Sequence, residues 1–354
     1  MRHKVWNFAE VDEAQCQRLS KALGVSPALA AVLTRRGLGD AEEARAFLDA
    51  KAQPFHDPFL LRDMEQAVAR ISDALACGEK ITVYGDYDVD GISSTALLVR
   101  VLRSLGASVS YYIPERQSEG YGLSCDALER IALDGTRLVI TVDCGISAVE
   151  EAQFAAGKVD LIVTDHHSPQ GELPRAVAVV NPKRPDCVYP DKRLAGVGVA
   201  YKLCQALWRR LRDEAFEDYL DLAALGTVAD VVPLLGENRL IVSRGLAAME
   251  KSAVVGLAAL VKQCGLAGAR LSAGRIGFGL APRLNAAGRL DSAARGVELL
   301  LTEDAAEAAE IAAALDEGNR QRQEIEQEIL AKAEEEIARE GLAPDKVLVV
   351  ARCV

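Results

Sequence analysis

The 354-residue sequence predicts an α/β protein with a mostly parallel sheet flanked by helices, a helical amino-terminal arm and a long carboxyl-terminal connecting helix. Short runs of β-branched residues alternate with helical stretches in the middle of the chain, which is typical of a parallel sheet covered on both faces. Apolar residues recur with helical spacing before about residue 76, and an alanine- and glutamate-rich stretch follows residue 302.

The predicted amino-terminal arm spans residues 1–60. Its apolar residues have helical spacing, two glycines interrupt the pattern, and Pro54 and Pro58 mark its end. We expect this small helical arm to precede the main domain, at residues 61–301.

The main domain contains five predicted strands. The first four are each followed by a helical stretch, and the last adds a further strand. In a parallel sheet the carboxyl ends of the strands share one edge, where open α/β folds bind ligands. The predicted strands span residues 81–85, 108–113, 137–142, 160–164 and 176–181.

The predicted connecting helix spans residues 302–343, and from Thr302 to Glu340 only Gly318 interrupts its alanine- and glutamate-rich pattern. Pro344 ends it, and residues 345–351 have the apolar pattern of a new strand. We therefore expect residues 344–354 to begin a further domain that this sequence does not continue.

The net charge of −11 neither supports nor excludes a nucleic-acid partner, because the charge is concentrated in one segment. Between Glu303 and Asp345, fourteen acidic residues stand against four basic ones. The rest of the chain is therefore near neutral, and a phosphate-binding cleft there is compatible with the composition.

The eight cysteines are scattered without a C-x-x-C pair, and the sequence has no signal peptide and no apolar run of membrane-spanning length. With only four histidines, a zinc site of the Cys/His type is disfavoured. Half of the residues are hydrophobic, enough to bury a sizeable core. We expect a cytoplasmic globular protein with reduced thiols and no membrane partner.

Three carboxylates follow the first predicted strand at alternate positions: Asp86, Asp88 and Asp90. In an extended chain such residues point to one side, and like charges so close together require a cation. The pattern D-x-D-x-D-G also opens an EF-hand loop. That loop needs a preceding helix, where this chain has a strand, and a glutamate where it has Leu97. A dehalogenase-type phosphatase loop would need threonine or valine in place of Asp90.

Two further clusters directly follow predicted strands: Asp143, and the triplet Asp165-His166-His167. Each alone is also compatible with an ordinary strand-end turn, where aspartate is common. Their coincidence at one sheet edge favours a ligand site. Mixed carboxylate and imidazole ligands suit Mn²⁺ or Mg²⁺, and two such ions about 3.5–4 Å apart can clamp a phosphodiester.

With these three clusters in this order, the sequence resembles the DHH phosphoesterases. Longer stretches look more specifically like the bacterial single-strand-specific 5′→3′ exonucleases of that superfamily, and the resemblance covers almost the whole chain. These stretches include VYGDYDVDGISSTALL (83–98), IPERQSEGYGLS (113–124), ITVDCGIS (140–147), GTVADVVPL (226–234) and PRLNAAGRLDSA (282–293).

The resemblance implies a set of metal ligands, with Asp143 bridging two ions. Asp86 is implied as a further ligand or as a partner of one. Some relatives carry a histidine ligand where this chain has Tyr84, a poor ligand for these ions, and Asp86 would substitute for that histidine at the first ion. Without the resemblance, Asp230 would be interpreted as a helix cap. The implied ligands are Asp88, Asp90, Asp143, His166 and Asp230.

The resemblance also implies roles in substrate binding and catalysis. His167 would act on the scissile phosphate as an electrostatic or acid group; the alternative is a histidine held by hydrogen bonds behind His166. Arg116 would bind the 5′-terminal phosphate, and Arg283 and Arg289 would contact phosphates of the strand.

The implied activity is two-metal hydrolysis of single-stranded DNA from its 5′ end, releasing 5′-mononucleotides in recombination and repair. Two alternatives remain open: a DHH phosphodiesterase that acts on oligoribonucleotides or cyclic dinucleotides, and a weakly active or silent scaffold. The implied partners are single-stranded DNA and a single-strand-binding protein or helicase, and we expect a monomer. The resemblance further implies that residues 344–354 begin a DHHA1 domain.

Overall fold

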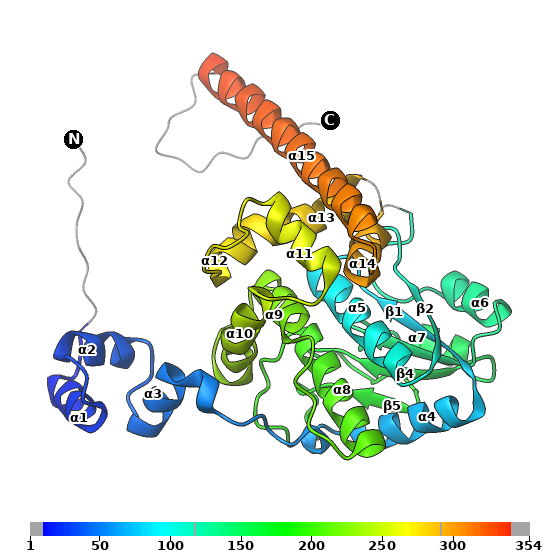
Figure 1. The fold of residues 1–354 in the computed structure, drawn as a ribbon, viewed down its shortest axis with the longest axis horizontal. Helices are drawn as coiled ribbons and strands as arrows, with labels where there is room; N and C mark the ends of the chain where they lie inside the picture. Colours follow the sequence, from blue (N-terminus) through cyan, green and yellow to red (C-terminus); the bar gives the residue numbers. More distant parts are fainter. Residues whose placement is uncertain (1–9, 117, 291, 341–354) are drawn as a thin grey trace.

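The computed structural model of the chain describes residues 10–340, except Gln117 and Asp291. A sheet lies at the centre of the molecule, helices cover both of its faces, and a long helix extends away from the body (Figure 1). This arrangement confirms the predicted α/β class. The strand predicted at residues 345–351, and the domain expected to begin at residue 344, lie outside the described residues.

The sheet has the strand order β2-β1-β3-β4-β5, and each pair of neighbouring strands is parallel. All five predicted strands are present, with small differences at their ends. Because β1, β3 and β4 are adjacent, the residues that follow these strands lie along one edge. The strands are β1 (Lys80–Gly85), β2 (Ser108–Tyr112), β3 (Leu138–Val142), β4 (Asp160–Thr164) and β5 (Ala178–Val180).

Strand side chains alternate between two buried clusters, one on each face of the sheet. Ile81 and Ile140 pack on the larger cluster with α4, α5 and α8, whereas Val139 and Val163 pack on the smaller one with α6 and α7. Each fully buried aliphatic side chain contributes about 1.5–3 kcal/mol to folding. The helices are α4 (Met64–Cys77), α5 (Val89–Ser104), α6 (Cys125–Leu133), α7 (Val149–Ala155) and α8 (Gly196–Arg212).

The helices after α8 extend the larger cluster and lead to the long helix. α9 packs on α5, and α10 packs on α9. They are α9 (Leu220–Ala229), α10 (Gly236–Met249), α11 (Val255–Gln263), α12 (Ala273–Arg275), the π-helical turn η3 (Ile276–Leu280), α13 (Ala281–Leu290) and α14 (Ala294–Leu301).

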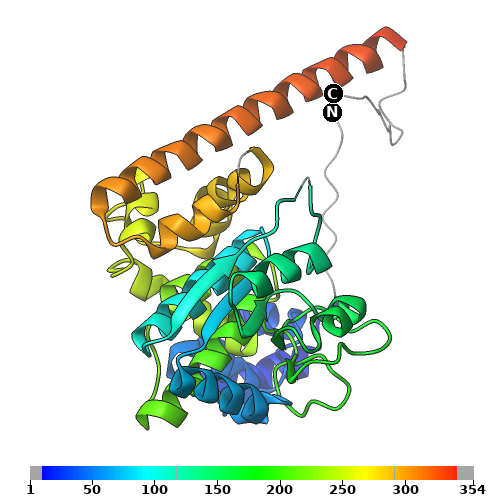
Figure 2. The ribbon, with the colours of Figure 1, turned by 90° about the vertical axis from the view of Figure 1, so that its right-hand side faces the viewer.

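The long helix α15 (Ala305–Glu340) packs on α11 and α13 through its first turns only. Ala308, Ile311 and Leu315 are buried there, whereas Ile325 and Ile329 are exposed further along. Figure 2 shows α15 crossing over α13 and continuing beyond the body. No helix in the described part of the chain is both long and apolar enough to cross a membrane.

The amino-terminal arm forms a small bundle of its own, in which Cys16, Leu19, Ala30 and Leu33 are buried together. Side chains of Asp12, Ser26 and Asp40 cap its three helices by accepting backbone N–H bonds. The arm contacts the body at α10, and its last turn contacts α4 and α8. It comprises α1 (Glu13–Leu23), α2 (Pro27–Arg35), α3 (Ala41–Leu48) and the 3₁₀ turns η1 (Ala50–Ala52) and η2 (Pro58–Leu60).

Candidate metal centre

The three strand-end clusters converge at the carboxyl ends of β1, β3 and β4. Within three groups of side chains, the ligand atoms all lie within 4.8 Å of one another. The convergence follows from the strand order, because the three strands are neighbours and all run in the same direction. The groups are Asp86, Asp88 and Asp143; Asp90, His166 and Asp230; and Asp143, His166 and His167.

The acids after β1 belong to the ligand groups, and two of them also accept hydrogen bonds from backbone N–H groups. Asp88 is the N-cap of α5, and its Oδ1 accepts the N–H groups of Asp90 (2.8 Å) and Gly91 (3.0 Å). Asp90 is buried, and its two oxygens accept the N–H groups of Gly196 (2.7 Å) and Val197 (2.8 Å) at the start of α8. Asp90 therefore joins the site to the N-terminus of α8, besides lying within the second group.

Asp143 lies at the centre of the site. Its backbone has a φ of 61°, a left-handed conformation that few residues other than glycine adopt and that aspartate and asparagine tolerate best. Its side chain is buried, and Oδ1 lies 3.2 Å from His166 Nε2. The start of α8 comes so close that a Cβ added at Gly196 would lie 2.3 Å from Asp143 Oδ1.

Asp230 reaches the same place from the C-terminal end of α9, and its Oδ2 lies 3.7 Å from His166 Nε2. His166 is buried on the segment after β4. Burial, followed by the positive charge of His167, lowers the pKa of His166 to about 4. The imidazole is therefore neutral at physiological pH, which is the form that binds metal ions.

The acids of the site are buried close to one another, and this raises the pKa values of several of them. Burial and the charge of Asp88 raise the pKa of Asp86 to about 7, and burial and the charge of Asp88 raise that of Asp230 to about 6. Burial and neighbouring carboxylates raise the pKa values of Asp90 and Asp143 well above their usual range. A positive ion among these groups would relieve this repulsion.

The hydrogen bonding of the site residues also fits a divalent ion. Several buried ligand atoms have no hydrogen-bond partner among the described residues. Such atoms are costly in a folded protein unless another species satisfies them. Oxygen and imidazole donors in this mixture suit Mn²⁺ or Mg²⁺. The atoms are Asp86 Oδ1, Asp143 Oδ1, His166 Nδ1 and Nε2, and Asp230 Oδ2.

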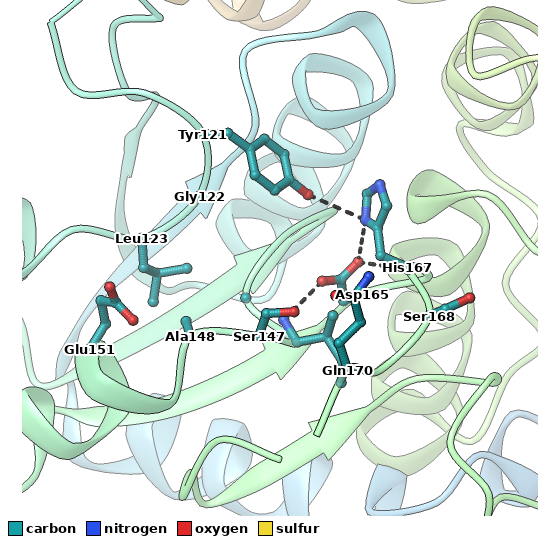
Figure 3. A pocket seen from close by; sticks show the side chains of 12 residues that line it. Tyr121, Gly122, Leu123, Ser147, Ala148, Glu151, Asp165, His167, Ser168 and Gln170 are labelled. Carbon is teal, nitrogen blue, oxygen red and sulfur yellow. Dashed lines mark hydrogen bonds and ion pairs between the residues drawn. The ribbon is translucent and has the colours of Figure 1, made fainter. Parts of the chain in front are cut away.

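His167 lies beside this site and is half-exposed, with a defined orientation. Figure 3 shows its ring between Tyr121 and Asp165. Nδ1 lies 2.8 Å from Asp165 Oδ1 and 3.3 Å from the Tyr121 hydroxyl, so Nε2 remains available to a substrate. The hydrogen bond to Asp165 raises the pKa of His167 and favours the protonated ring.

Asp165 belongs to a predicted strand-end cluster but was given no role of its own, and Tyr121 was not predicted to lie at the site. Burial opposes the charge of Asp165, but the hydrogen bonds from His167 and from the backbone lower its pKa. Tyr121 also donates to the backbone oxygen of Asp143 at 3.3 Å. The signal for Asp165 is its place directly before two histidines at a strand end. That for Tyr121 is its position in the EGYGLS motif.

A cavity of about 350 Å³ opens next to these groups, and Asp86, Asp88, His167 and Arg116 line it. The Arg116 guanidinium lies 5.1 Å from the centre of the Tyr87 ring, within the range of a cation–π contact. The opposite wall is α13, whose Asn285 accepts the N–H of Val89 at 3.2 Å. Of Arg116 and Arg283, the predicted phosphate-binding arginines whose side chains the structure describes, Arg116 lines the cavity beside the clustered acids.

Arg283 does not line this cavity, and its guanidinium is bound by other groups of the protein. It pairs with Asp316 of α15 at 2.7 Å and donates to the Gly279 carbonyl at 2.6 Å. The side chain of Arg289 lies outside the described part of the structure, so its phosphate contact stays a prediction. Tyr84, at the position where some relatives have histidine, is buried and donates to the Gly122 carbonyl at 3.0 Å.

The chain is similar to proteins of one family. Residues 80–227 match the model of the DHH family, N-terminal domain. The chain is 44% identical to the single-stranded-DNA-specific exonuclease RecJ of Bacillus subtilis, over 97% of this chain and 43% of that protein. It is 40% identical to RecJ of Thermus thermophilus, over 90% of this chain and 46% of that protein. The chain thus spans about half the length of these relatives.

Solved structures give the same result. The crystal structure of RecJ from Thermus thermophilus in complex with Mn²⁺ matches with a TM-score of 0.79 and 37% identity, over 92% of this chain and 46% of that chain. A crystal structure of exonuclease RecJ bound to manganese matches with a TM-score of 0.73 and 41% identity, over 79% of this chain and 71% of that chain.

Proposed function

The chain belongs to the RecJ group of the DHH family, and from this membership we propose that it hydrolyses single-stranded DNA from the 5′ end and releases 5′-mononucleotides. The proposed setting is DNA recombination and repair. One observation supports the proposal: acids and histidines from three adjacent strand ends meet in groups, and several of their buried ligand atoms have no hydrogen-bond partner in the described part of the protein.

The ligand groups suggest how two divalent ions would be held. Asp86 and Asp88 would bind one ion, Asp90, His166 and Asp230 the other, and Asp143 would bridge them. When bound, the ions supply Lewis-acid activation of the attacking water and stabilisation of the departing oxygen. Mn²⁺ and Mg²⁺ are the proposed ions, because RecJ structures are known in complex with each.

His167 would act on the phosphate that undergoes hydrolysis. Asp165 holds Nδ1 and stabilises the protonated ring, so the Nε2 proton can be donated to a phosphoryl oxygen. Tyr121 restrains the same ring from the other side. The proposal therefore assigns catalysis to His167 and Asp143, and ring positioning to Asp165 and Tyr121.

Arg116 would select the end of the strand. Its guanidinium lies over Tyr87 at the rim of the cavity that contains the clustered acids. A planar fork of donors suits a terminal phosphate, which carries more charge than an internal one. This contact would favour a 5′-phosphorylated end. We propose Arg283 and Arg289 as contacts of the strand's other phosphates on resemblance alone.

The alternatives are not favoured. The RecJ relatives match up to 97% of this chain, amino-terminal arm included, and this sequence contains every predicted ligand acid. Neither a small-substrate phosphodiesterase nor a silent scaffold accounts for both features. We also propose a monomer in the cytoplasm that contacts a single-strand-binding protein or a helicase. The seven described cysteines are free thiols, which suits that compartment.

One assay tests the proposal directly. Single-stranded DNA labelled at its 5′ end and an RNA dinucleotide are each incubated with the chain and Mn²⁺, Mg²⁺ or a chelator. We expect the DNA label to appear as a mononucleotide in the presence of metal and not with the chelator. Faster cleavage of the RNA dinucleotide, or internal cleavage of the DNA, would overturn the proposal.

A further inference from the structure

A second cavity, of about 490 Å³, lies between the amino-terminal arm and the body. Its walls come from the end of α2, from α3, from the segment after η1 and from the start of α10. None of its lining residues belongs to the metal centre. It is large enough for one small organic ligand, and it is partly enclosed.

The cavity exists because the arm is held to α10 at a few points. Arg239 Nε donates to the Phe47 carbonyl at 2.5 Å, and its guanidinium lies 3.6 Å from the centre of the Phe47 ring. Arg244 donates to the carbonyls of Lys51 (2.9 Å) and Gln53 (3.0 Å). These contacts fix the arm on one side of the cavity and leave the space between open.

Two positive charges at this cavity lack a counterion in the part of the chain that the structure describes, because neither Arg36 nor Arg239 pairs with a carboxylate there. Both side chains line the cavity, and burial, followed by the positive charge of Arg36, lowers the pKa of Arg239. Such a pair provides donors for a doubly charged anion.

The other charged groups of the cavity largely cancel. Arg193 pairs with Asp191 at 3.0 Å, and Glu237 pairs with the buried Lys202 at 3.0 Å. Glu43 lines the cavity and is exposed to solvent. The net local charge is therefore positive. The remaining lining is largely apolar and includes Leu38, Pro54, Leu235 and Leu240.

We propose that this cavity binds a nucleotide, with its phosphate between Arg36 and Arg239 and its base against the apolar wall. The guanidinium pair would bind the phosphate, and the apolar side chains would cover the base and sugar, which inorganic phosphate lacks. The nucleotide would be either a free mononucleotide or one unit of a nucleic-acid strand. The site is separate from the metal centre, so the inference does not depend on hydrolysis.

Calorimetry in the presence of a chelator tests the site without catalysis. The probes are thymidine 5′-monophosphate, thymidine and a short oligothymidylate. Under these conditions the metal centre is rich in acids and repels phosphate. We expect the monophosphate or the oligonucleotide to bind and thymidine to bind more weakly. Binding of the oligonucleotide alone would identify the ligand as part of a strand.

Matched variants assign the binding to this cavity. Arg36 is exposed and makes no ion pair with a described residue, so Arg36→Glu should fold normally and weaken binding by about tenfold or more. Arg18→Glu makes the same charge change on α1 and should alter binding less than about twofold. Ala46→Phe should also weaken binding, because it fills the cavity without a change of charge.

Three results would overturn the inference. One is the absence of binding by both the monophosphate and the oligonucleotide. Another is binding that Arg36→Glu and Ala46→Phe leave unchanged. The third is binding that Arg116→Ala removes instead, which would assign the ligand to the metal cleft. Hydrolysis of DNA by the same preparations is measured separately, so failure of the proposed activity is distinguishable from failure of this site.

Discussion

At the scale of single residues, Asp143 has the most constrained position in the site. It adopts a left-handed backbone conformation, its carboxylate is buried among other acids, and its carbonyl accepts a hydrogen bond from Tyr121. A backbone with positive φ costs a non-glycine residue of order 1 kcal/mol. The rest of the site holds Asp143 in this conformation, which places its side chain between the two ligand groups.

Replacing Asp143 by Asn should abolish hydrolysis without unfolding the protein. Asparagine has the same shape and tolerates positive φ, whereas alanine would add backbone strain. Loss of the bridging charge should lower the rate by roughly two orders of magnitude or more. Without metal, the melting temperature should stay the same or rise, because one of several crowded charges is gone.

The control for this variant is Asp126→Asn, which removes an exposed acid on α6. It should leave both rate and melting temperature unchanged. The two-ion account is wrong if Asp143→Asn retains activity within about tenfold of wild type.

Arg116 tests recognition of the strand end. Replacing it by Ala should slow hydrolysis of 5′-phosphorylated DNA more than that of 5′-hydroxyl DNA, because a charge-assisted contact worth about 1.5–3 kcal/mol is lost. Initial rates on the two substrates give the comparison. Arg137→Ala removes an exposed arginine that precedes β3, at the opposite edge of the sheet, and should affect neither rate. Equal losses on both substrates would show that Arg116 does not bind the terminus.

At the scale of elements, the start of α8 is part of the metal centre although it carries none of the predicted ligands. Its first two N–H groups bind Asp90, and Gly196 lies against Asp143. The helix N-terminus also stabilises negative charge nearby. From the sequence, Asp90 was predicted to be a metal ligand, and no role in the site was predicted for the residues of α8. The Asp90 contact spans 106 residues and depends on how α8 packs.

Gly196→Ala adds a single methyl group, and we expect this to weaken metal binding. The added Cβ would lie 2.3 Å from Asp143 Oδ1, so the carboxylate or the helix must move. A suitable control lies two residues further along the helix: at Gly198 the nearest atom to an added Cβ is Leu194 Cδ2, at 3.2 Å. Calorimetric Mn²⁺ affinity should fall for Gly196→Ala and remain near wild type for Gly198→Ala. Equal affinities in both variants would contradict the close packing.

The ion pair between α13 and α15 suggests a structural role for Arg283, beside its predicted phosphate contact. Asp316 accepts from Arg283 of α13 (2.7 Å) and Gln263 of α11 (3.1 Å), which connect α15 to these two helices, and from Arg320 of α15 itself (2.6 Å). Since α13 also carries Asn285 to the cleft, the pairing links the long helix to the wall of the site.

Asp316→Asn should lower the free energy of unfolding by about 1–3 kcal/mol, because the carboxylate is buried and the change weakens its bond to the mostly buried Arg283. Glu317→Gln, an exposed neighbour on the same helix, should change it by less than about 0.5 kcal/mol. Urea denaturation measures both. An unchanged stability for Asp316→Asn, with DNA binding lost in Arg283→Ala, would instead favour the phosphate contact.

At the scale of the whole molecule, the sequence predicts the sheet well, and the site in part. β1, β3 and β4 are short buried runs rich in β-branched residues, so their positions follow from local composition. The convergence of Asp86, Asp143 and His166 follows from strand ends at one edge. Contacts between distant helices, such as Arg283 with Asp316 and the cavity at Arg36, depend on tertiary packing that local patterns do not encode.

We propose that the strand ends of β1, β3 and β4 hold two divalent ions. Calorimetric titration of Mn²⁺ into the wild-type chain and the Asp143→Asn variant tests it most directly. We expect two ions per wild-type chain and a large loss in the variant. Affinity should rise from about pH 6 to pH 8, because Asp86, with a pKa of about 7, must release its proton. No binding by the wild type, or identical binding by the variant, would contradict the account.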